Sequence, residues 1–230
     1  MNDVEVRVSR ARRRWLAHCS ALVAAGVAAW ASRVRAEAPG KARPPLILVV
    51  GDSLSAEYGL ARGSGWVALL DARLRQQQIA ASVVNASISG DTTSGGRTRL
   101  PALLKQYRPD IVVLELGAND ALRGLPLGMT RANLGAMAAG AKAAGAKVVI
   151  AGMRLPPNYG RQYGDEFAGL FASVARAEGA ALVPFLLAGV ADVPQAESMF
   201  QHDGLHPVAA AHPTILANVW PVLRPLLVKR

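Results

Sequence analysis

The segment VVGDSLSAEYG, residues 49–59, contains the end of an aliphatic run and the polar turn that follows it. The run starts at Leu46 and stops at Gly51, and a short apolar run that ends in glycine is typical of a buried strand. Asp52, Ser53 and Ser55 come next. A serine at such a position either caps the next helix or acts as a nucleophile, and the rest of the chain has to distinguish these two roles.

The rest of the chain repeats this pattern of a strand followed by a helix. Further apolar, β-branched runs occupy residues 82–87, 111–117, 147–152 and 181–185. Segments with helical spacing lie at 66–78, 95–107, 130–144 and 165–178, and a last one follows Pro213. Runs without a polar face, each followed by a helix, require a parallel sheet that is covered on both sides. The sequence therefore predicts an α/β fold, a three-layer α/β/α sandwich around five parallel strands.

The first 36 residues differ from this pattern. Arginines cluster between residues 7 and 14, an uncharged and Ala-rich stretch follows at 15–32, and small residues precede Ala36. This order is that of a secretory signal peptide, for which we expect cleavage after Ala36. The pair Arg12 and Arg13 also resembles a twin-arginine export signal. The predicted organisation is a signal peptide at 1–36, a linker at 37–44 and one domain at 45–230.

Two other interpretations of the first segment compete with a signal peptide. A membrane anchor needs ~20 apolar residues, whereas this stretch is shorter and contains His18. A lipoprotein signal places its apolar residues before the cysteine, whereas here they follow Cys19. We therefore expect the segment to be removed, which leaves a periplasmic or secreted domain without stable membrane insertion.

Composition narrows the class of protein. The chain has 230 residues, of which 51% are hydrophobic, enough for one domain with a full core. Without residues 1–36, 19 of the 26 basic and 14 of the 16 acidic residues remain, so the formal net charge falls from +10 to +5. No basic run with interleaved aromatic residues remains, and we expect no nucleic-acid partner. The only cysteine, Cys19, leaves with the signal peptide, so the exported domain would have no disulfide.

Four polar segments are placed to meet at one edge of the predicted sheet. Glycine and polar residues follow the first three strands, at 51–53, 89–91 and 117–120, and the stretch DGLHP occupies 203–207. Ligands of a parallel α/β sheet bind outside the carboxyl ends of its strands. We therefore expect these four segments to form a common site.

Ser53 as a nucleophile needs a base that takes its proton and a third group that fixes the tautomer of that base. Asp203 and His206 supply such a pair, three residues apart on one loop with a glycine between them. His202 and His212 have no acid in the corresponding position. A helix cap for Ser53 and a surface or capping histidine for His206 remain the alternatives.

Acyl transfer also needs hydrogen-bond donors for the oxygen that becomes negative in the transition state. Gly90 can offer an unobstructed backbone N–H, and the side-chain amide of Asn119 is a neutral donor. Each residue also has an ordinary structural interpretation, a tight turn for Gly90 and an Asx turn for Asn119.

The blocks GDSLS, SGDTTSGG, GAND and DGLHP, in this order, resemble those of the SGNH or GDSL hydrolase family. The resemblance covers almost all of residues 45–228. The stretches GDSLSAEYG, GANDALRG and MRLPPNYGRQYGDEF are especially similar to its branch of multifunctional bacterial acyl thioesterases, lysophospholipases and arylesterases. It implies a flavodoxin-like parallel sheet and ester hydrolysis through a covalent acyl-enzyme, without a cofactor.

The resemblance also implies a role for each matching position. The expected triad is Ser53 as nucleophile, His206 as base and Asp203 as the acid that orients it. The expected oxyanion hole consists of the backbone N–H groups of Ser53 and Gly90 and the side chain of Asn119. The expected acyl-binding residues are Leu122, Leu125 and Leu155.

The remaining polar residues near the site are expected to be structural. Ser55 then has no catalytic role. Asp52, Asp91 and Asp120 are dispersed among glycine turns and lack ligand spacing with histidine, so we expect no metal site and assign these residues to helix caps and loop braces.

Three functions remain to be compared. The first is a monomeric serine esterase that acts on small-molecule fatty-acyl esters and thioesters. The second, a carbohydrate acetyl esterase, uses the same chemistry on a smaller acyl group. The third, a periplasmic binding domain on the same sheet, has no need for Ser53, Asp203 and His206 together, which counts against it.

Overall fold

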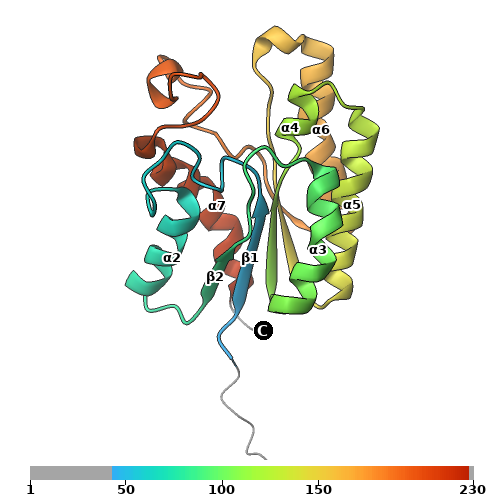
Figure 1. Ribbon diagram of the computed structural model, residues 1–230, viewed down its shortest axis with the longest axis vertical. Coiled ribbons are helices and arrows are strands. Elements are labelled where there is room, and N and C mark those ends of the chain that lie inside the picture. The colour runs from blue at the N-terminus through green and yellow to red at the C-terminus, as the bar shows by residue number, and fades with distance from the viewer. Residues whose placement is uncertain (1–42, 228–230) are drawn as a thin grey trace, which may run out of the picture. The chain divides into compact units, whose positions relative to one another are not determined.

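A five-stranded parallel sheet forms the centre of the fold, in the order β2-β1-β3-β4-β5 (Figure 1). The computed structural model describes residues 43–227, so the predicted signal peptide and most of the predicted linker lie outside the described residues. The strands are β1 (Leu46–Gly51), β2 (Ser82–Asn85), β3 (Ile111–Glu115), β4 (Lys147–Ala151) and β5 (Ala181–Val183). The prediction of five parallel strands is confirmed.

Helices cover both faces of the sheet (Figure 1). On one face, α2 (Trp66–Gln76) packs against α7 (His212–Leu227). On the other face, α5 (Leu127–Ala143) packs between α3 (Thr93–Tyr107) and α6 (Arg161–Glu178). The connections contain the short elements α4 (Ala118–Leu122), η1 (Pro157–Tyr159), η2 (Ala196–Met199) and η3 (Ala209–Ala211). The predicted three-layer sandwich is thereby confirmed.

The central strands are apolar on both faces because helices cover both. Every residue of β3 is buried, and so is every residue of β1 after Leu46. The edge strand β2 is only partly buried. Trp66, Phe167 and Phe171 are the largest side chains of the core. The carboxylate of Glu115, at the end of β3, is also fully buried.

Several helices begin earlier than the sequence pattern indicates. Helix α3 starts at Thr93 because the side chain of Thr92 accepts a hydrogen bond from the N–H of Gly95, at 3.3 Å. Helices α5 and α6 start at residues 127 and 161 rather than 130 and 165. Helix α4 is too short for a periodic pattern, and the sequence did not predict it.

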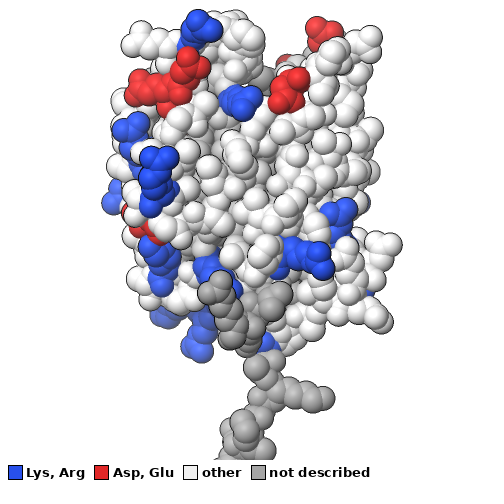
Figure 2. Space-filling model, turned by 180° about the vertical axis from the view of Figure 1, so that it is seen from behind, with Lys and Arg blue, Asp and Glu red and all other residues white. Residues whose placement is uncertain are grey.

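The charged side chains are unevenly distributed on the face shown in Figure 2. Acidic side chains lie mostly toward the upper end, together with some basic ones, whereas the lower part carries mostly Lys and Arg. The upper end is the one at which the strands have their carboxyl ends. Within residues 43–227, no helix combines the length and the hydrophobicity that crossing a bilayer requires.

Candidate active site

The turn after β1 presents Ser53 to a cleft. Gly51 closes the strand, and the carboxylate of Asp52 then accepts a hydrogen bond from the N–H of Leu54 at 3.1 Å. A second bond runs from the N–H of Ala56 to the carbonyl of Asp52 at 2.9 Å. Asp52 therefore caps the turn, as expected, and leaves the hydroxyl of Ser53 free to face the cleft that this residue lines.

Ser53, His206 and Asp203 form one chain of hydrogen bonds. The Nε2 atom of His206 lies 2.8 Å from the Oγ of Ser53, although the two residues are 153 positions apart. The Nδ1 atom of His206 lies 2.6 Å from the Oδ2 of Asp203. Only 21% of the imidazole side chain is exposed, so the ring is largely shielded from solvent. The structure thus brings together the three residues that the sequence predicts as a triad.

Asp203 is held in its charged form by its own loop. Its Oδ1 accepts hydrogen bonds from the N–H of His206 at 3.0 Å and from the N–H of Leu205 at 2.9 Å. These bonds lower the pKa of Asp203 to about 2, with the bond to the His206 ring adding to the effect. The carboxylate therefore accepts a hydrogen bond from Nδ1 of the ring, and this tautomer leaves Nε2 as the acceptor that faces Ser53.

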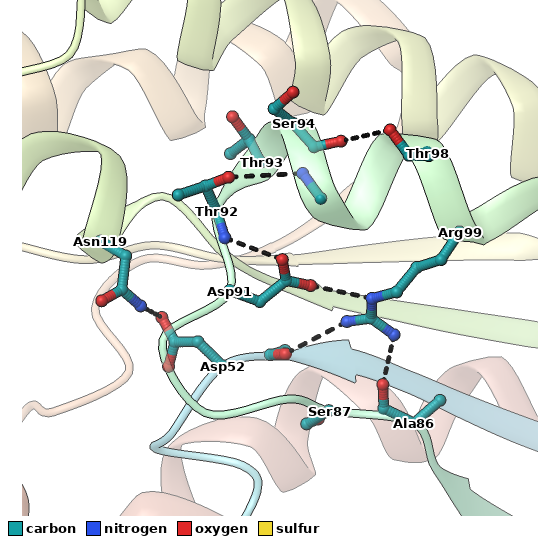
Figure 3. Close-up of polar contacts among 12 residues, drawn as sticks. Asp52, Ala86, Ser87, Asp91, Thr92, Thr93, Ser94, Thr98, Arg99 and Asn119 are labelled. Atoms are coloured by element: carbon teal, nitrogen blue, oxygen red, sulfur yellow. Dashed lines mark hydrogen bonds and ion pairs between the residues drawn. The ribbon is translucent and has the colours of Figure 1, made fainter.

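The predicted oxyanion donors come from three segments, which follow β1, β2 and β3. The side chain of Asn119, at the start of α4, lines the same cleft as Ser53 and donates from Nδ2 to Asp52 Oδ2 at 3.0 Å (Figure 3). An amide nitrogen carries two hydrogens, so one remains for a ligand. Within residues 43–227, the N–H groups of Ser53 and Gly90 donate no hydrogen bond. Gly90 has a φ of +76°, which favours glycine, and it is not among the residues that line the cleft.

Arg99 fastens the loop that contains Gly90 to the end of the sheet (Figure 3). Its Nε donates to Asp91 Oδ2 at 2.8 Å, and its other nitrogens donate to the carbonyls of Ala86 and Gly51. Arg99 of α3 therefore ties the ends of β1 and β2 to the loop that precedes this helix. The expectation that Asp91 braces a loop agrees with this geometry.

Asp120 forms a second brace, which lies under α4. It is fully buried and accepts hydrogen bonds from the N–H of Thr93, at 2.8 Å, and from the hydroxyl of the same residue. The hydroxyl of Thr93 in turn accepts from Asn133 at 3.1 Å. This cluster links α3, α4 and α5 beneath Asn119.

A buried polar cluster lies on the interior side of the nucleophile turn. Ser55 is 1% exposed, donates from its hydroxyl to Glu115 at 2.6 Å and accepts from the indole N–H of Trp66 at 3.1 Å. Burial raises the pKa of Glu115 well above its usual range, and the nearby charge of Asp52 raises it further. Burial also raises the pKa of Asp52 to about 6. Sequence reasoning missed Glu115 because it reads as part of an apolar strand.

His212, unlike His206, is a buried histidine with a structural role. It begins α7, is 1% exposed, and accepts a hydrogen bond at Nδ1 from the N–H of Trp66 at 3.0 Å. This contact satisfies the first N–H of α2. Burial lowers the pKa of His212, which keeps the ring neutral and able to accept.

A cleft of about 930 Å³ opens beside Ser53 and His206. Leu122 and Leu155 line it, as the sequence predicts, but Leu125 does not. Leu125 instead closes the turn after α4, where its N–H donates to the carbonyl of Asp120 at 2.9 Å, and this hydrogen bond keeps its backbone in the turn.

Other apolar residues of the cleft escaped sequence reasoning. They follow β5 or precede the DGLHP stretch, and they include Phe185, Leu187 and Phe200. The position of Phe185 and Leu187 directly after the last strand was the available signal, because strand ends face the site. Among the described residues, no group of three or more His, Cys, Asp or Glu side chains is arranged to hold a metal ion.

The model of the GDSL-like lipase/acylhydrolase family matches residues 49–213. The chain belongs to this family. Esterase TesA of Pseudomonas aeruginosa is 53% identical over 181 residues, which are 79% of this chain and 89% of that protein. The thioesterase 1/protease 1/lysophospholipase L1 of Escherichia coli strain K12 is 41% identical and covers 79% of this chain and 84% of its own length.

Two solved structures show the same fold. A crystal structure of TesA aligns with a TM-score of 0.75 and 52% identity, over 79% of this chain and 99% of that one. The esterase EstA of Pseudoalteromonas sp., in a structure inhibited by monoethylphosphonate, aligns with a TM-score of 0.74 and 38% identity, over 79% of this chain and 98% of that one.

Proposed function

We propose that this protein is a serine esterase that hydrolyses acyl esters and thioesters through a covalent acyl-enzyme. The observation that carries this proposal is the continuous hydrogen-bond chain from Ser53 through His206 to Asp203. A hydroxyl on a base that is itself oriented by a carboxylate is the arrangement that activates serine. A binding domain has no need for such a chain, and relatives at 53% and 41% identity are named as an esterase and a thioesterase.

The reaction would proceed in two halves. Ser53 Oγ attacks the acyl carbonyl carbon while its proton passes to His206 Nε2 and the carbonyl electron pair moves onto oxygen. The imidazolium then gives its proton to the alcohol or thiol as the bond to the leaving group breaks, which leaves the acyl group on Ser53. Water repeats the sequence, with His206 as base again, and releases the acid.

Three donors would stabilise the negative oxygen in each half. They are the N–H groups of Ser53 and Gly90, which are not otherwise engaged within the described residues, and the second amide hydrogen of Asn119. The bond from Asn119 to Asp52 fixes the amide before substrate arrives, so little reorganisation is needed as charge develops.

The cleft supports fatty-acyl rather than acetyl groups as substrates. Leu155, Phe185 and Leu187 are among the apolar residues that line it. Each methylene buried against such walls contributes ~0.8 kcal/mol, which corresponds to about fourfold in kcat/KM. We propose aryl esters, acyl thioesters and lysophospholipids as substrates, with kcat/KM rising from acetyl to medium-length chains.

A panel of p-nitrophenyl esters of increasing acyl length, run beside an acyl thioester and a lysophospholipid, tests this proposal. The expected result is a rise in kcat/KM from two to about eight carbons, following the burial of methylenes. A sharp maximum at acetyl, with no measurable hydrolysis of the octanoyl ester, would support a carbohydrate acetyl esterase instead.

Labelling tests the nucleophile directly. An organophosphonate ester should modify Ser53 stoichiometrically, as mapped by peptide mass spectrometry, and should abolish hydrolysis. The structure of EstA inhibited by monoethylphosphonate shows that this class of reagent reacts with a relative. Modification of Ser55 with Ser53 untouched would overturn the assignment.

The first 36 residues support export of the domain to the periplasm or the medium. N-terminal sequencing of the exported protein should begin at Glu37.

We further propose that the mature domain is a monomer that binds no nucleic acid. Light scattering coupled to gel filtration should give a single-chain mass, and a band-shift assay should show no complex.

A further inference from the structure

The face of the His206 imidazole packs against Tyr58. The two ring centroids are 4.4 Å apart, and the ring planes are tilted by 40°. Tyr58 lies in the same turn as the nucleophile, where its N–H donates to the carbonyl of Ser53 at 3.3 Å. Half of Tyr58 is exposed, so the side chain does not belong to the core. Contact with the imidazole is the interaction that explains an aromatic residue at this exposed position.

Gln201 joins the Tyr58 turn to the loop that holds His206. Its side-chain Nε2 donates to the carbonyl of Tyr58 at 2.9 Å and to that of Pro207 at 3.1 Å. Its backbone N–H donates to the carbonyl of His206 at 2.7 Å. The amide also fits tightly, because a Cβ added at Gly59 would lie 2.0 Å from Gln201 Oε1.

We propose that Tyr58 and Gln201 are positioning residues for His206, an inference that rests on the proposed role of His206 as the base. The bonds to Asp203 and Ser53 restrain the two ring nitrogens in the plane of the imidazole. They restrain tilting out of that plane far less. The Tyr58 ring blocks one face of the imidazole, and Gln201 fixes the separation of the two loops that must meet.

This contact strengthens during the reaction. When His206 accepts the serine proton, it becomes a cation, and the face of an aromatic ring attracts a nearby cation. The attraction is greater in the transition state than in the resting enzyme, so it favours kcat rather than substrate binding. The phenol hydroxyl has no part in this effect, whereas the aromatic ring is essential.

Steady-state kinetics on p-nitrophenyl butyrate test the inference, together with the rate at which an organophosphonate modifies Ser53. Tyr58→Leu should lower kcat by roughly 2- to 5-fold, the factor expected for a partly exposed cation–aromatic contact, and leave KM unchanged. Tyr58→Phe should retain wild-type values. Gln201→Met should also lower kcat without raising KM. Both slow variants should be modified by the phosphonate more slowly by a similar factor.

Matched controls separate these effects from general damage. Tyr107→Leu removes a tyrosine at the opposite end of the sheet, the last residue of α3, and Gln77→Met changes a glutamine on the surface beyond α2. Both should leave kcat and KM unchanged. Circular dichroism and a thermal melt report whether each variant folds. Because Tyr58 is half exposed, we expect its substitution to leave the fold intact.

A His206→Ala variant distinguishes the two ways of failing. If it keeps full activity, the proposed function is wrong and so is the inference. If it is inactive while Tyr58→Leu and Gln201→Met match the controls, the site assignment holds and the positioning role is refuted. A rise in KM at unchanged kcat in Tyr58→Leu would make Tyr58 a substrate contact, and equal losses in Tyr58→Phe and Tyr58→Leu would exclude the ring effect.

Discussion

Ser53 and Ser55 lie two residues apart in one turn, yet their surroundings differ. The hydroxyl of Ser53 faces the cleft and lies 2.8 Å from the imidazole of His206. The hydroxyl of Ser55 points into the interior, where it bonds to a buried carboxyl and to an indole. The same functional group is thus placed beside a base in one case and within a closed polar cluster in the other. Partner and burial, rather than residue type, determine which serine can react.

The largest expected effect sharpens this comparison at Ser53. Ser53→Ala should lower kcat by about 10⁴-fold or more, because a triad acts as a unit and the remaining donors sustain only residual catalysis. The melting temperature should stay within a few degrees of wild type. The assay is hydrolysis of p-nitrophenyl butyrate, and the control is Ser64→Ala, which changes a partly exposed serine whose hydroxyl bonds only to the carbonyl of Ala61. Full activity in Ser53→Ala would show that Ser53 is not the nucleophile.

Asn119→Ala should have the next largest effect. Loss of one oxyanion donor costs ~2.7–4 kcal/mol of transition-state stabilisation, so kcat should fall about 10²- to 10³-fold while KM changes little. The same substitution leaves Asp52 without its amide partner, and a thermal melt on the same sample separates this structural contribution. An unchanged kcat would exclude Asn119 from the oxyanion hole.

Ser55→Ala should show the opposite behaviour from Ser53→Ala. It removes a hydrogen-bond partner from both Glu115 and the Trp66 indole, and buried groups left unsatisfied cost about 1–3 kcal/mol of the free energy of unfolding. Activity per folded molecule should remain within a few-fold of wild type. Urea titration and active-site labelling measure the two quantities. Loss of activity without loss of stability in Ser55→Ala would contradict the purely structural role of Ser55.

The smallest expected effect concerns the pH dependence of stability. The raised pKa of Glu115 means that its stabilising contribution is complete below the unfolded value of ~4.3 and is lost as pH rises toward the folded pKa. The stabilising contribution of Asp52 is likewise lost as pH rises from its unfolded pKa of ~3.9 to its folded pKa of about 6. Glu115→Gln carries a neutral amide in place of the carboxyl. It therefore removes the loss of stability that ionisation of Glu115 causes.

Urea unfolding between pH 5 and pH 8 measures this prediction. The stability of Glu115→Gln relative to wild type should improve as pH rises, and that of the exposed Glu166→Gln should not follow this trend. A stability difference between Glu115→Gln and wild type that stays constant from pH 5 to pH 8 would show that the buried carboxyl is already ionised in the folded protein.

The sequence by itself determined the strands, the three-layer architecture and the local geometry of each polar block. Apolar runs of β-branched residues can be buried only as strands of a covered sheet, and this preference is local. The pairing of Asp203 with His206 is local too, since they are three positions apart and the N–H groups of the same loop donate hydrogen bonds to the carboxylate. The membership in the GDSL-like family also follows from such blocks.

Only the tertiary structure decided how these pieces interact. The contact between Ser53 and His206 joins positions 153 apart, and it depends on how the helices pack rather than on any local preference. The same holds for Glu115, which a strand pattern marks as core and which the fold places under the nucleophile turn. Phe185 and Leu187 line the cleft, whereas Leu125 does not, because a hydrogen bond to Asp120 keeps its backbone in a turn. Burial and long-range hydrogen bonds are properties of the assembled chain, and a one-dimensional pattern cannot contain them.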